Sequence, residues 1–350
     1  MHSTEGMKPK VVLVTGRYRK AIDTLEENDC EVVILPDGFD KTALLKELCD
    51  ADGLIYGLEP LTKEVFEGSP KLKGVALFAS GYDNVDVDAA SRYGVYVANA
   101  PGANTDAVAE FTFGLILSLV RHIHDACITV REGGWRKDEF VGIQLKGKVL
   151  GIIGFGRIGQ RVGRLGRGFG MEVWAYDPFI PNEIFEGEGV SKGDLDEVLS
   201  KSDILTLHAR LTESSRHMIG EEELARMKSS AYLINTGRGD LVVEAAILDA
   251  LDHGRLAGAA LDVFSQEPLK DRRILEHPLI LPTPHISGWN DVSRYNIGKT
   301  AAEQVLMAIA GKRPINAVND PREPRNKQTS RGVLPKTKNS LSDEENGFCQ

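Results

Sequence analysis

Short apolar runs alternate with stretches of helical spacing along the first hundred residues. The runs at 11–15, 31–35, 53–56, 75–78 and 95–98 have the length and composition of buried strands. Apolar residues at helical spacing lie between them, for example at 41–49 and 61–66. Strands that alternate with helices are joined by crossovers, so this pattern predicts a parallel sheet.

A long apolar helix, expected over about 104–121, separates this series from a second one. It follows the helix-breaking pair Pro101-Gly102, with Asn104 or Thr105 as its cap. The second series has predicted strands at 149–153, 172–176, 204–208, 231–235, 257–262 and 279–281, a helix at 243–251, and a final helix at 291–310. We therefore expect an α/β protein made of two doubly wound parallel sheets.

Length and composition support two domains. The chain has 350 residues, of which 42% are hydrophobic and 27% charged, and both fractions are ordinary for a globular protein. From Pro321 onward the chain is rich in proline and charge and poor in apolar residues. We expect residues 321–350 to form a disordered polar tail.

Charge and apolar-run length argue against several classes of partner. The net charge of −9 disfavours a dedicated nucleic-acid binder. The longest apolar stretch, 111–120, is too short for a membrane span, and the polar N-terminus lacks the features of a signal peptide. The sequence thus predicts a cytoplasmic protein with no membrane or nucleic-acid partner.

The cysteines and histidines show no metal-binding pattern. The four cysteines are scattered and form no CxxC pair, which favours free thiols in a reducing compartment. His122 and His124 are two residues apart and cannot share a helix face. We expect no metal site.

The strongest local motif is a glycine-rich turn, Gly154-Phe-Gly156-Arg-Ile-Gly159. It follows a predicted strand and opens an amphipathic helix, which is the setting of a dinucleotide-binding turn. Gly154 would allow the tight turn, Gly156 the approach of a pyrophosphate, and Gly159 the packing of helix on strand. The alternative is a glycine-rich turn without a ligand.

An acidic residue indicates which dinucleotide binds. The next predicted strand ends in Asp177, which can accept hydrogen bonds from the adenosine ribose hydroxyls and would repel a 2′-phosphate. The residues that follow, Pro178-Phe-Ile180, offer no cation. NAD is therefore favoured over NADP.

Three segments at later strand ends hold candidate catalytic residues. Arg238 is flanked by glycines, and a guanidinium can bind a carboxylate through paired hydrogen bonds. His285 stands between prolines and a glycine turn, and Glu267 could orient its imidazole. Taken singly, an arginine such as Arg238 is more often a solvated loop residue, and a histidine such as His285 is more often structural than catalytic.

Together these segments resemble the D-isomer-specific 2-hydroxyacid dehydrogenase family over about residues 11–318. Besides the glycine turn, the resemblance includes Ser80-Gly-Tyr-Asp-Asn-Val-Asp86, Asn99-Ala-Pro-Gly102, Val108-Ala-Glu110, Asn235-Thr-Gly-Arg238-Gly, Asp262-Val-Phe, Glu267-Pro268 and Thr283-Pro-His285.

The resemblance implies a hydride transfer between NAD and C2 of a small D-2-hydroxy or 2-oxo acid. Arg238 would bind the substrate carboxylate and polarise the keto oxygen, His285 would be the acid/base, and Glu267 would stabilise it. The backbone N–H groups of Ser80 and Gly81 would also bind the carboxylate. The cofactor would be bound by Thr105, Gly154, Gly156, Arg157, Ile158, Gly159, Asp177, His208, Ala209, Thr236, Gly237, Asp262, His285 and Gly288.

The resemblance also implies a domain arrangement. Residues 1–101 and 286–320 would form a discontinuous substrate-binding domain, and 102–285 an inserted NAD-binding domain. The catalytic cleft would lie between the two, with hinges near 100–103 and 286–290. A homodimer would form through the NAD-binding domain around residues 104–144.

Several positions depart from the family pattern or stay ambiguous. Leu77 stands where relatives that act on 3-phosphoglycerate carry an arginine, which disfavours that substrate, and Glu267 argues against formate. Trp289 could shape the substrate pocket or pack the hinge, Tyr82 is similarly ambiguous, and Arg210 has no assigned role. Tyr295 and Lys299 match the YxxxK of short-chain dehydrogenases, but a C-terminal helix is the wrong place for it.

Two questions stay open at this stage. Some relatives are NAD-sensing corepressors that keep the catalytic residues, so a binding protein on the same fold is the alternative to an enzyme. The substrate is also undecided, with candidates from glyoxylate and hydroxypyruvate to bulkier 2-oxo acids.

Overall fold

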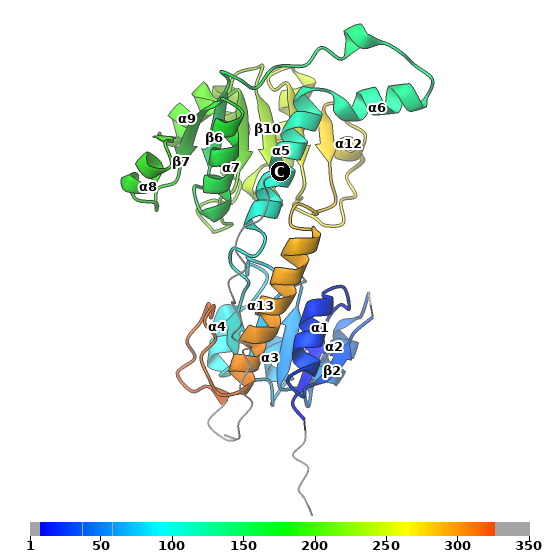
Figure 1. Ribbon diagram of the computed structural model, residues 1–350, viewed down its shortest axis with the longest axis vertical. Helices are drawn as coiled ribbons and strands as arrows, with labels where there is room; N and C mark the ends of the chain where they lie inside the picture. The colour runs from blue at the N-terminus through cyan, green and yellow to red at the C-terminus, as the bar shows by residue number, and fades with distance from the viewer. Residues whose placement is uncertain (1–7, 37, 58, 326–350) are drawn as a thin grey trace, which may run out of the picture. The chain divides into compact units, whose positions relative to one another are not determined.

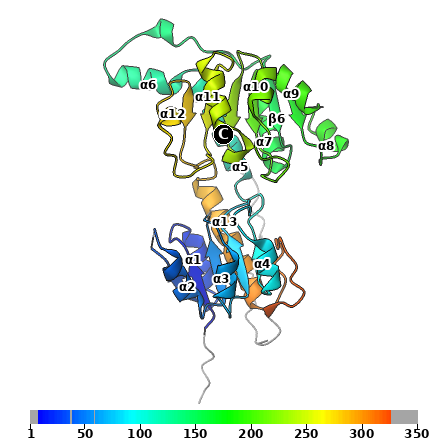
Figure 2. The same cartoon turned by 180° about the vertical axis from the view of Figure 1, so that it is seen from behind.

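The computed structural model describes residues 8–36, 38–57 and 59–325. The chain divides into two compact units, which are Met1–Pro101 with Tyr295–Gln350, and Gly102–Arg294. Each unit is built around its own parallel sheet, flanked by helices (Figures 1 and 2). The expected fold class, α/β with two doubly wound parallel sheets, is confirmed.

The first unit holds a five-stranded sheet in the order β2-β1-β3-β4-β5, with every neighbouring pair parallel. Its strands are β1 (Lys10–Leu13), β2 (Glu31–Ile34), β3 (Gly53–Tyr56), β4 (Gly74–Leu77) and β5 (Tyr96–Ala98). Its helices are α1 (Arg19–Glu26), α2 (Lys41–Leu48), α3 (Lys63–Glu67), α4 (Val87–Arg92) and α13 (Asp291–Ile309), whose first turn belongs to the second unit.

Alternation along the strands assigns the two faces of this sheet. Val12, Leu54 and Val75 point into a core shared with α2, α3 and α4. On the opposite face, Cβ atoms built at Gly53 and Gly74 would lie 2.6 Å from Val305 Cγ2 and 2.3 Å from Ala308 Cβ. The two glycines thus let α13 pack directly on the sheet, so a C-terminal helix completes the N-terminal unit.

The second unit holds a seven-stranded sheet in the order β12-β11-β10-β9-β6-β7-β8, again with parallel pairs throughout. Its strands are β6 (Val149–Ile153), β7 (Glu172–Tyr176), β8 (Ser191–Lys192), β9 (Ile204–Leu207), β10 (Tyr232–Asn235), β11 (Gly258–Leu261) and β12 (Ile280–Pro282).

Helices cover both faces of the second sheet. Leu150 and Ile152 pack in one core with α5 and α7, and Ile153 packs in the other with α9, α10 and α11. The helices of this unit are α5 (Thr105–Val120), α6 (Ile123–Arg131), α7 (Arg157–Gly168), α8 (Asn182–Gly187), α9 (Leu195–Lys201), α10 (Glu221–Arg226), α11 (Glu244–Asp252) and α12 (Arg272–Leu275), with 3₁₀ turns η1 (Lys137–Glu139) and η2 (Gly239–Leu241).

Two boundaries differ from the sequence-based expectation. The second unit runs to Arg294, whereas the expected domain ended at 285. The Asp262 carboxylate attaches the start of the additional segment by accepting hydrogen bonds from the N–H groups of Ile286 and Ser287. Arg325 lies in the expected tail, yet its guanidinium donates to the Phe66 and Leu72 carbonyls, so the folded chain reaches at least this residue. The rest of that tail, 326–350, lies outside the described residues.

No single helix of the described residues is both long and apolar enough to cross a membrane. The consecutive helices α5 and α6, bent by 62° to each other, could do so together by length and composition alone. No group of three or more metal-ligating side chains occurs in the part of the chain that the structure describes.

Candidate active site

The expected catalytic residues follow the carboxyl ends of three neighbouring strands of the second unit. Arg238 follows β10, Glu267 follows β11, and His285 follows β12. Parallel strands present their carboxyl ends at one edge of a sheet, so the topology brings the three segments together.

His285 and Glu267 form a hydrogen-bonded pair. His285 Nδ1 lies 2.7 Å from Glu267 Oε2, and the two side chains are 26% and 35% exposed. The backbone of His285 has a positive φ of 53°, held by a hydrogen bond from its N–H to the Asp262 carbonyl. Because His285 Nδ1 is hydrogen-bonded to Glu267, Nε2 is the ring nitrogen that can exchange a proton with a substrate.

Opposing effects act on the pKa of Glu267. Burial raises it, but the hydrogen bond and charge of His285, a hydrogen bond from the Phe264 N–H and the charge of Arg238 together lower it below its ordinary value. The Glu267 carboxylate is therefore ionised near neutral pH.

This shift predicts the pH dependence of stability. Because the pKa of Glu267 is lowered on folding, the unfolded chain binds its proton more readily, and the stabilisation is present above the ordinary value of 4.5 and lost as pH falls through the lower folded value. Urea unfolding at a series of pH values should show the wild type losing its advantage over Glu267→Gln below about pH 4.5. A difference that stays constant down to pH 3 would contradict the assigned pair.

Asp262 is a buried carboxylate that organises the histidine loop. It is 0% exposed. Its Oδ1 accepts hydrogen bonds from Thr283 Oγ1 (2.7 Å) and the Ile286 N–H (2.9 Å), and its Oδ2 accepts one from the Ser287 N–H (2.8 Å). These bonds hold the backbone on both sides of His285. In this structure Asp262 thus positions the loop, whereas the sequence suggested only a cofactor contact.

Asn235 positions the arginine loop in a similar way. Its Nδ2 donates to the Arg238 carbonyl (2.8 Å), and its Oδ1 accepts from the Gly237 N–H (3.0 Å). A Cβ at Gly239 would lie 1.9 Å from the Phe264 carbonyl carbon, so this loop touches the one that carries Glu267. No role for Asn235 was expected from the sequence, although a polar amide at the end of a predicted strand was the available signal.

The glycine turn has the stereochemistry that a bound dinucleotide needs. Gly154 has a φ of +91°, and a Cβ there would lie 2.3 Å from the Ala209 nitrogen. A Cβ at Gly159 would lie 2.1 Å from the Gly154 carbonyl oxygen. At Gly156, in contrast, a Cβ would meet no atom within 4 Å, so this side of the turn is open to a ligand.

The crowding at Gly159 predicts the effect of adding one methyl group. Gly159→Ala should push α7 away from the turn, lower the free energy of unfolding by about 1–3 kcal/mol, and weaken NADH binding at least tenfold. Gly168→Ala, in the same helix, meets no atom within 4 Å and is the matched control. Urea unfolding and NADH fluorescence titration measure both effects; equal NADH affinity in the two variants would contradict this role.

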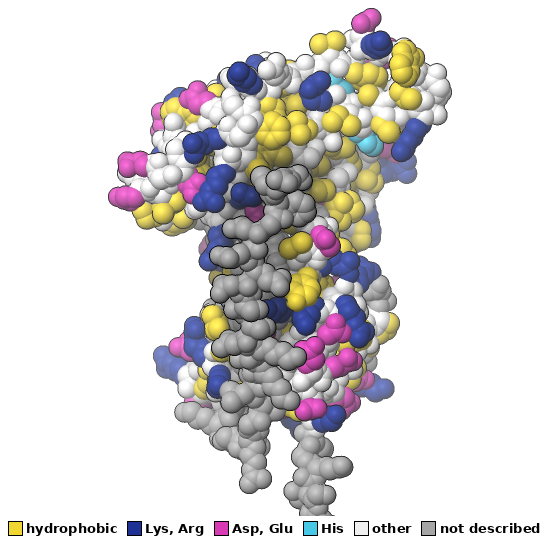
Figure 3. All heavy atoms as spheres, in the orientation of Figure 1, with side chains coloured by type: hydrophobic (Ala, Val, Ile, Leu, Met, Phe, Trp, Pro, Cys, Tyr) yellow, Lys and Arg dark blue, Asp and Glu magenta, His cyan; other side chains and the backbone are white. Residues whose placement is uncertain are grey.

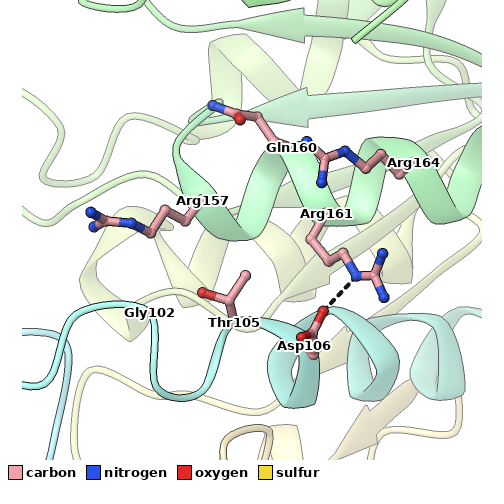
Figure 4. Close-up of a pocket in the computed structure, with 7 residues that line it drawn as sticks. All are labelled: Gly102, Thr105, Asp106, Arg157, Gln160, Arg161 and Arg164. Carbon is pink, nitrogen blue, oxygen red and sulfur yellow. Dashed lines mark ion pairs between the residues drawn. The ribbon is translucent and has the colours of Figure 1, made fainter. Parts of the chain in front are cut away.

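A basic groove of about 480 Å³ adjoins the glycine turn. Figure 4 shows its walls, which are the first turn of α5, with Thr105 and Asp106, and the outer face of α7. Arg157, Gln160, Arg161 and Arg164 all line it, and Arg161 pairs with Asp106 at 2.5 Å. Guanidinium groups beside the N-terminus of α7 make the groove suitable for phosphate groups. Arg161 and Arg164 were absent from the sequence-based expectation.

Asp177 and His208 lie on either side of the glycine turn. Asp177 Oδ2 accepts a hydrogen bond from the Phe155 N–H and Oδ1 one from the Phe179 N–H, both at 2.9 Å. His208 Nε2 lies 2.9 Å from Thr206 Oγ1, and its Nδ1 is buried without a partner among the described residues. Burial lowers the pKa of His208 to about 3, so its imidazole is neutral at neutral pH.

The remaining predicted cofactor residues lie at the same edge of the second sheet. Thr236 is 6% exposed and its hydroxyl lies 3.0 Å from that of Thr112. Gly288 packs against the Asn104 side chain, and Ile158 is the second residue of α7.

Ser80 and Gly81 belong to the first unit, where they follow β4. Ser80 Oγ donates to the Ala100 carbonyl (3.1 Å), and the Ser80 carbonyl accepts from Asn99 Nδ2 (2.5 Å). These bonds fix the loop in which both residues lie. Their role as carboxylate donors stays a prediction.

Sequence comparisons relate the chain to known dehydrogenases. The family model described as "D-isomer specific 2-hydroxyacid dehydrogenase, NAD binding domain" matches residues 113–287. The glyoxylate reductase of Thermococcus litoralis is 38% identical over 322 residues, which cover 89% of this chain and 97% of that protein. The D-3-phosphoglycerate dehydrogenase of Methanocaldococcus jannaschii is 39% identical over 321 residues, or 91% of this chain; the match spans only 61% of that longer protein.

A solved structure is similar over almost the same region. The TT0316 protein from Thermus thermophilus has a TM-score of 0.83 and 33% identity, covering 89% of this chain and 100% of that one. The similarity therefore extends to the arrangement of the elements as well as to the sequence motifs.

Proposed function

Because the chain belongs to the D-isomer specific 2-hydroxyacid dehydrogenase family, we propose that it is an NAD-dependent dehydrogenase of small 2-hydroxy and 2-oxo acids. The observation that carries this proposal is the pair formed by His285 Nδ1 and Glu267 Oε2 at 2.7 Å, close to the charge of Arg238. An ionised carboxylate, an imidazole and a guanidinium at one sheet edge suit proton transfer to an oxygen that gains negative charge.

In the reduction of a 2-oxo acid, each side chain has a separate task. Arg238 binds the substrate carboxylate and stabilises the negative charge that develops on the keto oxygen. His285 donates the proton on Nε2 to that oxygen, and Glu267 stabilises the ring while it is protonated. In the reverse direction Nε2 accepts the hydroxyl proton. Asp262 and Asn235 act as positioning residues for these two catalytic loops.

The residues around the glycine turn fit a dinucleotide. Gly156 leaves open space for a pyrophosphate, and Thr105, Arg157 and the first N–H groups of α7 would bind it. Asp177 would bind the adenosine ribose and disfavour a 2′-phosphate, which supports NAD over NADP. When bound by these residues, NAD would supply the chemistry of hydride transfer with the substrate C2.

The test is NADH oxidation by the full chain with a panel of 2-oxo acids. The panel includes glyoxylate, hydroxypyruvate and phosphohydroxypyruvate, since the relatives are named for glyoxylate and phosphoglycerate, and is repeated with NADPH. We expect turnover on the order of 1–1000 s⁻¹ with NADH. NADH binding without turnover of any acid would favour the corepressor-like alternative, which none of the three relatives reported above supports.

We also propose that the protein forms a homodimer through the second unit. Hydrophobic side chains gather over α5 and α6 on the face shown in Figure 3. In α6 and the segment after it, Ile123, Val130, Trp135 and Val141 are 52%, 52%, 75% and 78% exposed. Apolar exposure of this kind is typical of an interface, and a second copy of the chain would cover it.

The dimer proposal predicts the effect of polar substitutions in this segment. Trp135→Ser combined with Val141→Ser should raise the dimer dissociation constant at least about 30-fold, because buried tryptophans dominate interface energies. Phe179→Ser, which removes a side chain 86% exposed outside the segment, is the control. Light scattering coupled to size exclusion measures the mass, and a variant that stays dimeric at low micromolar concentration would contradict the assignment.

A further inference from the structure

Glu244, the first residue of α11, holds the loop that carries Glu267. Its Oε1 accepts a hydrogen bond from the Ser265 N–H (2.7 Å), and its Oε2 accepts one from the Ser265 hydroxyl (2.8 Å). Glu244 and Ser265 are 21 residues apart in the chain. The two oxygens of one carboxylate thus fix both the backbone and the side chain of Ser265.

The N–H group held by Glu244 is next to the one that holds Glu267. Glu267 Oε1 accepts a hydrogen bond from the Phe264 N–H (3.1 Å), while its Oε2 lies 2.7 Å from His285 Nδ1. Phe264 and Ser265 are consecutive, so their two peptide groups are joined at a single Cα atom. A shift of Ser265 would therefore turn the Phe264 N–H and move the Glu267 carboxylate with it.

The peptide between Phe264 and Ser265 is also packed against the segment that leads into α11. A Cβ at Gly239 would lie 1.9 Å from the Phe264 carbonyl carbon and 2.3 Å from the Ser265 nitrogen. Gly239 and Glu244 belong to the same short connection between β10 and α11. This connection therefore fixes the peptide by close packing at one point and by hydrogen bonds at another.

The position of the Glu267 carboxylate decides which ring nitrogen of His285 carries the proton. A neutral imidazole has one N–H and one bare nitrogen, and an ionised carboxylate beside Nδ1 favours the proton there. Nε2 is then bare and can accept a proton from a hydroxyl group. A displaced carboxylate would let the proton move to Nε2, so that part of the molecules would lack the base.

We propose that Glu244 is a positioning residue that keeps the Glu267 carboxylate on His285 Nδ1. The proposal rests on the proposed dehydrogenase function, in which His285 Nε2 exchanges a proton with the substrate oxygen. In this role the reach of the Glu244 side chain to Ser265 is decisive. Its negative charge has the separate effect of stabilising the N-terminus of α11.

Two conservative variants separate reach from charge. Glu244→Asp keeps the charge at the start of α11, but its side chain is one methylene shorter and cannot bind both groups of Ser265. Glu244→Gln loses the charge, but its amide can accept from the Ser265 N–H and donate to the Ser265 hydroxyl. Both residue types are tolerated in the first turn of a helix, so both variants should fold.

The proton on His285 is located by NMR of the full chain labelled with ¹⁵N-histidine, at about pH 9, where histidine side chains are neutral. Correlations from the carbon-bound ring protons report both ring nitrogens even when the N–H exchanges rapidly, and His285→Ala assigns the signals. We expect the Nδ1–H form in the wild type and in Glu244→Gln. Glu244→Asp should show a mixture with the Nε2–H form.

Kinetics of 2-oxo acid reduction measure the consequence for turnover. Glu244→Asp should lower kcat roughly 10–100-fold, and Glu244→Gln should stay within about threefold of the wild type. KM for the acid should change little, because Asn235 holds the Arg238 carbonyl without Glu244.

Glu221 provides the matched control. It is the exposed first residue of α10, and its side chain makes no hydrogen bond or ion pair with another residue that the structure describes. Glu221→Asp and Glu221→Gln make the same chemical changes at the same helix position, and both should leave the His285 proton and kcat unchanged.

The NMR result and the turnover result fail separately. If Glu244→Asp keeps the pure Nδ1–H form, or if Glu244→Gln or the wild type lacks it, the positioning role is overturned whatever the turnover. A kcat for Glu244→Asp equal to that of Glu221→Asp would also overturn it. If the proton moves as expected but the wild type reduces no acid, the dehydrogenase function fails and the positioning of Glu267 stands.

Discussion

Replacing His285 with alanine should lower kcat for 2-oxo acid reduction by roughly 10²–10⁴-fold. The expected loss is large because His285 Nε2 is the proposed proton donor and its ring is held by Glu267 at 2.7 Å. NADH affinity should change little, since the glycine turn and the groove beside α7 are untouched. Stopped-flow kinetics and NADH fluorescence titration measure the two quantities.

Two further observations separate a chemical role from a structural one. Added imidazole should restore part of the rate of His285→Ala, because it can donate the missing proton in the space left free. His253→Ala, which removes a histidine whose side chain is 67% exposed, should keep the wild-type rate and is the matched control. A His285→Ala enzyme within threefold of the wild-type kcat would refute the proposed acid/base role.

Replacing Arg238 with alanine should reduce kcat/KM for the acid by roughly 10³-fold, as expected when a paired contact to a carboxylate and the stabilisation of a developing oxyanion are both lost. Unlike the histidine variant, this one should raise KM as well as lower kcat. Arg238→Lys should recover only part of the loss, because an ammonium group cannot make two parallel hydrogen bonds.

Two further experiments test the role of Arg238, which are chemical rescue of Arg238→Ala and substitution of an exposed arginine elsewhere on the surface. Guanidinium ion should restore part of the activity of Arg238→Ala. Arg272→Ala removes a guanidinium whose side chain is 82% exposed and should leave KM unchanged. If KM in Arg238→Ala equals that of Arg272→Ala, the substrate carboxylate must be bound elsewhere.

These catalytic side chains depend on a buried polar scaffold. Asp262 holds the histidine loop through three hydrogen bonds, and its own N–H donates to the Asn235 carbonyl. Asn235 in turn holds the Arg238 carbonyl. One chain of hydrogen bonds therefore connects the loop of His285 with the loop of Arg238. A buried network of this kind is rigid only while each of its polar groups keeps its hydrogen-bond partner.

Local patterns were sufficient for the elements nearest the cofactor turn. The strands predicted at 149–153 and 172–176 coincide with β6 and β7. The helix expected over about 104–121 is α5 (Thr105–Val120), with Asn104, one of the two expected caps, at its N-cap position. A buried strand or helix must supply apolar side chains along its length. It therefore appears in the sequence as an apolar run or a periodic apolar pattern between turns. β8 was missed because its two residues, Ser191 and Lys192, are both exposed and leave no apolar signal.

The sequence by itself determined the fold class and the glycine turn, because alternating apolar runs and closely spaced glycines carry those two signals. It also supplied Arg238, Glu267 and His285 as candidates, because each lies after a predicted strand within a motif of the family. Only the tertiary structure showed that Asp262 and Asn235 position the catalytic loops. Such relations join residues that are distant along the chain, as Asp262 and Ile286 are. Spacing along the sequence does not encode them, since they arise when parallel strands bring their loops to one edge.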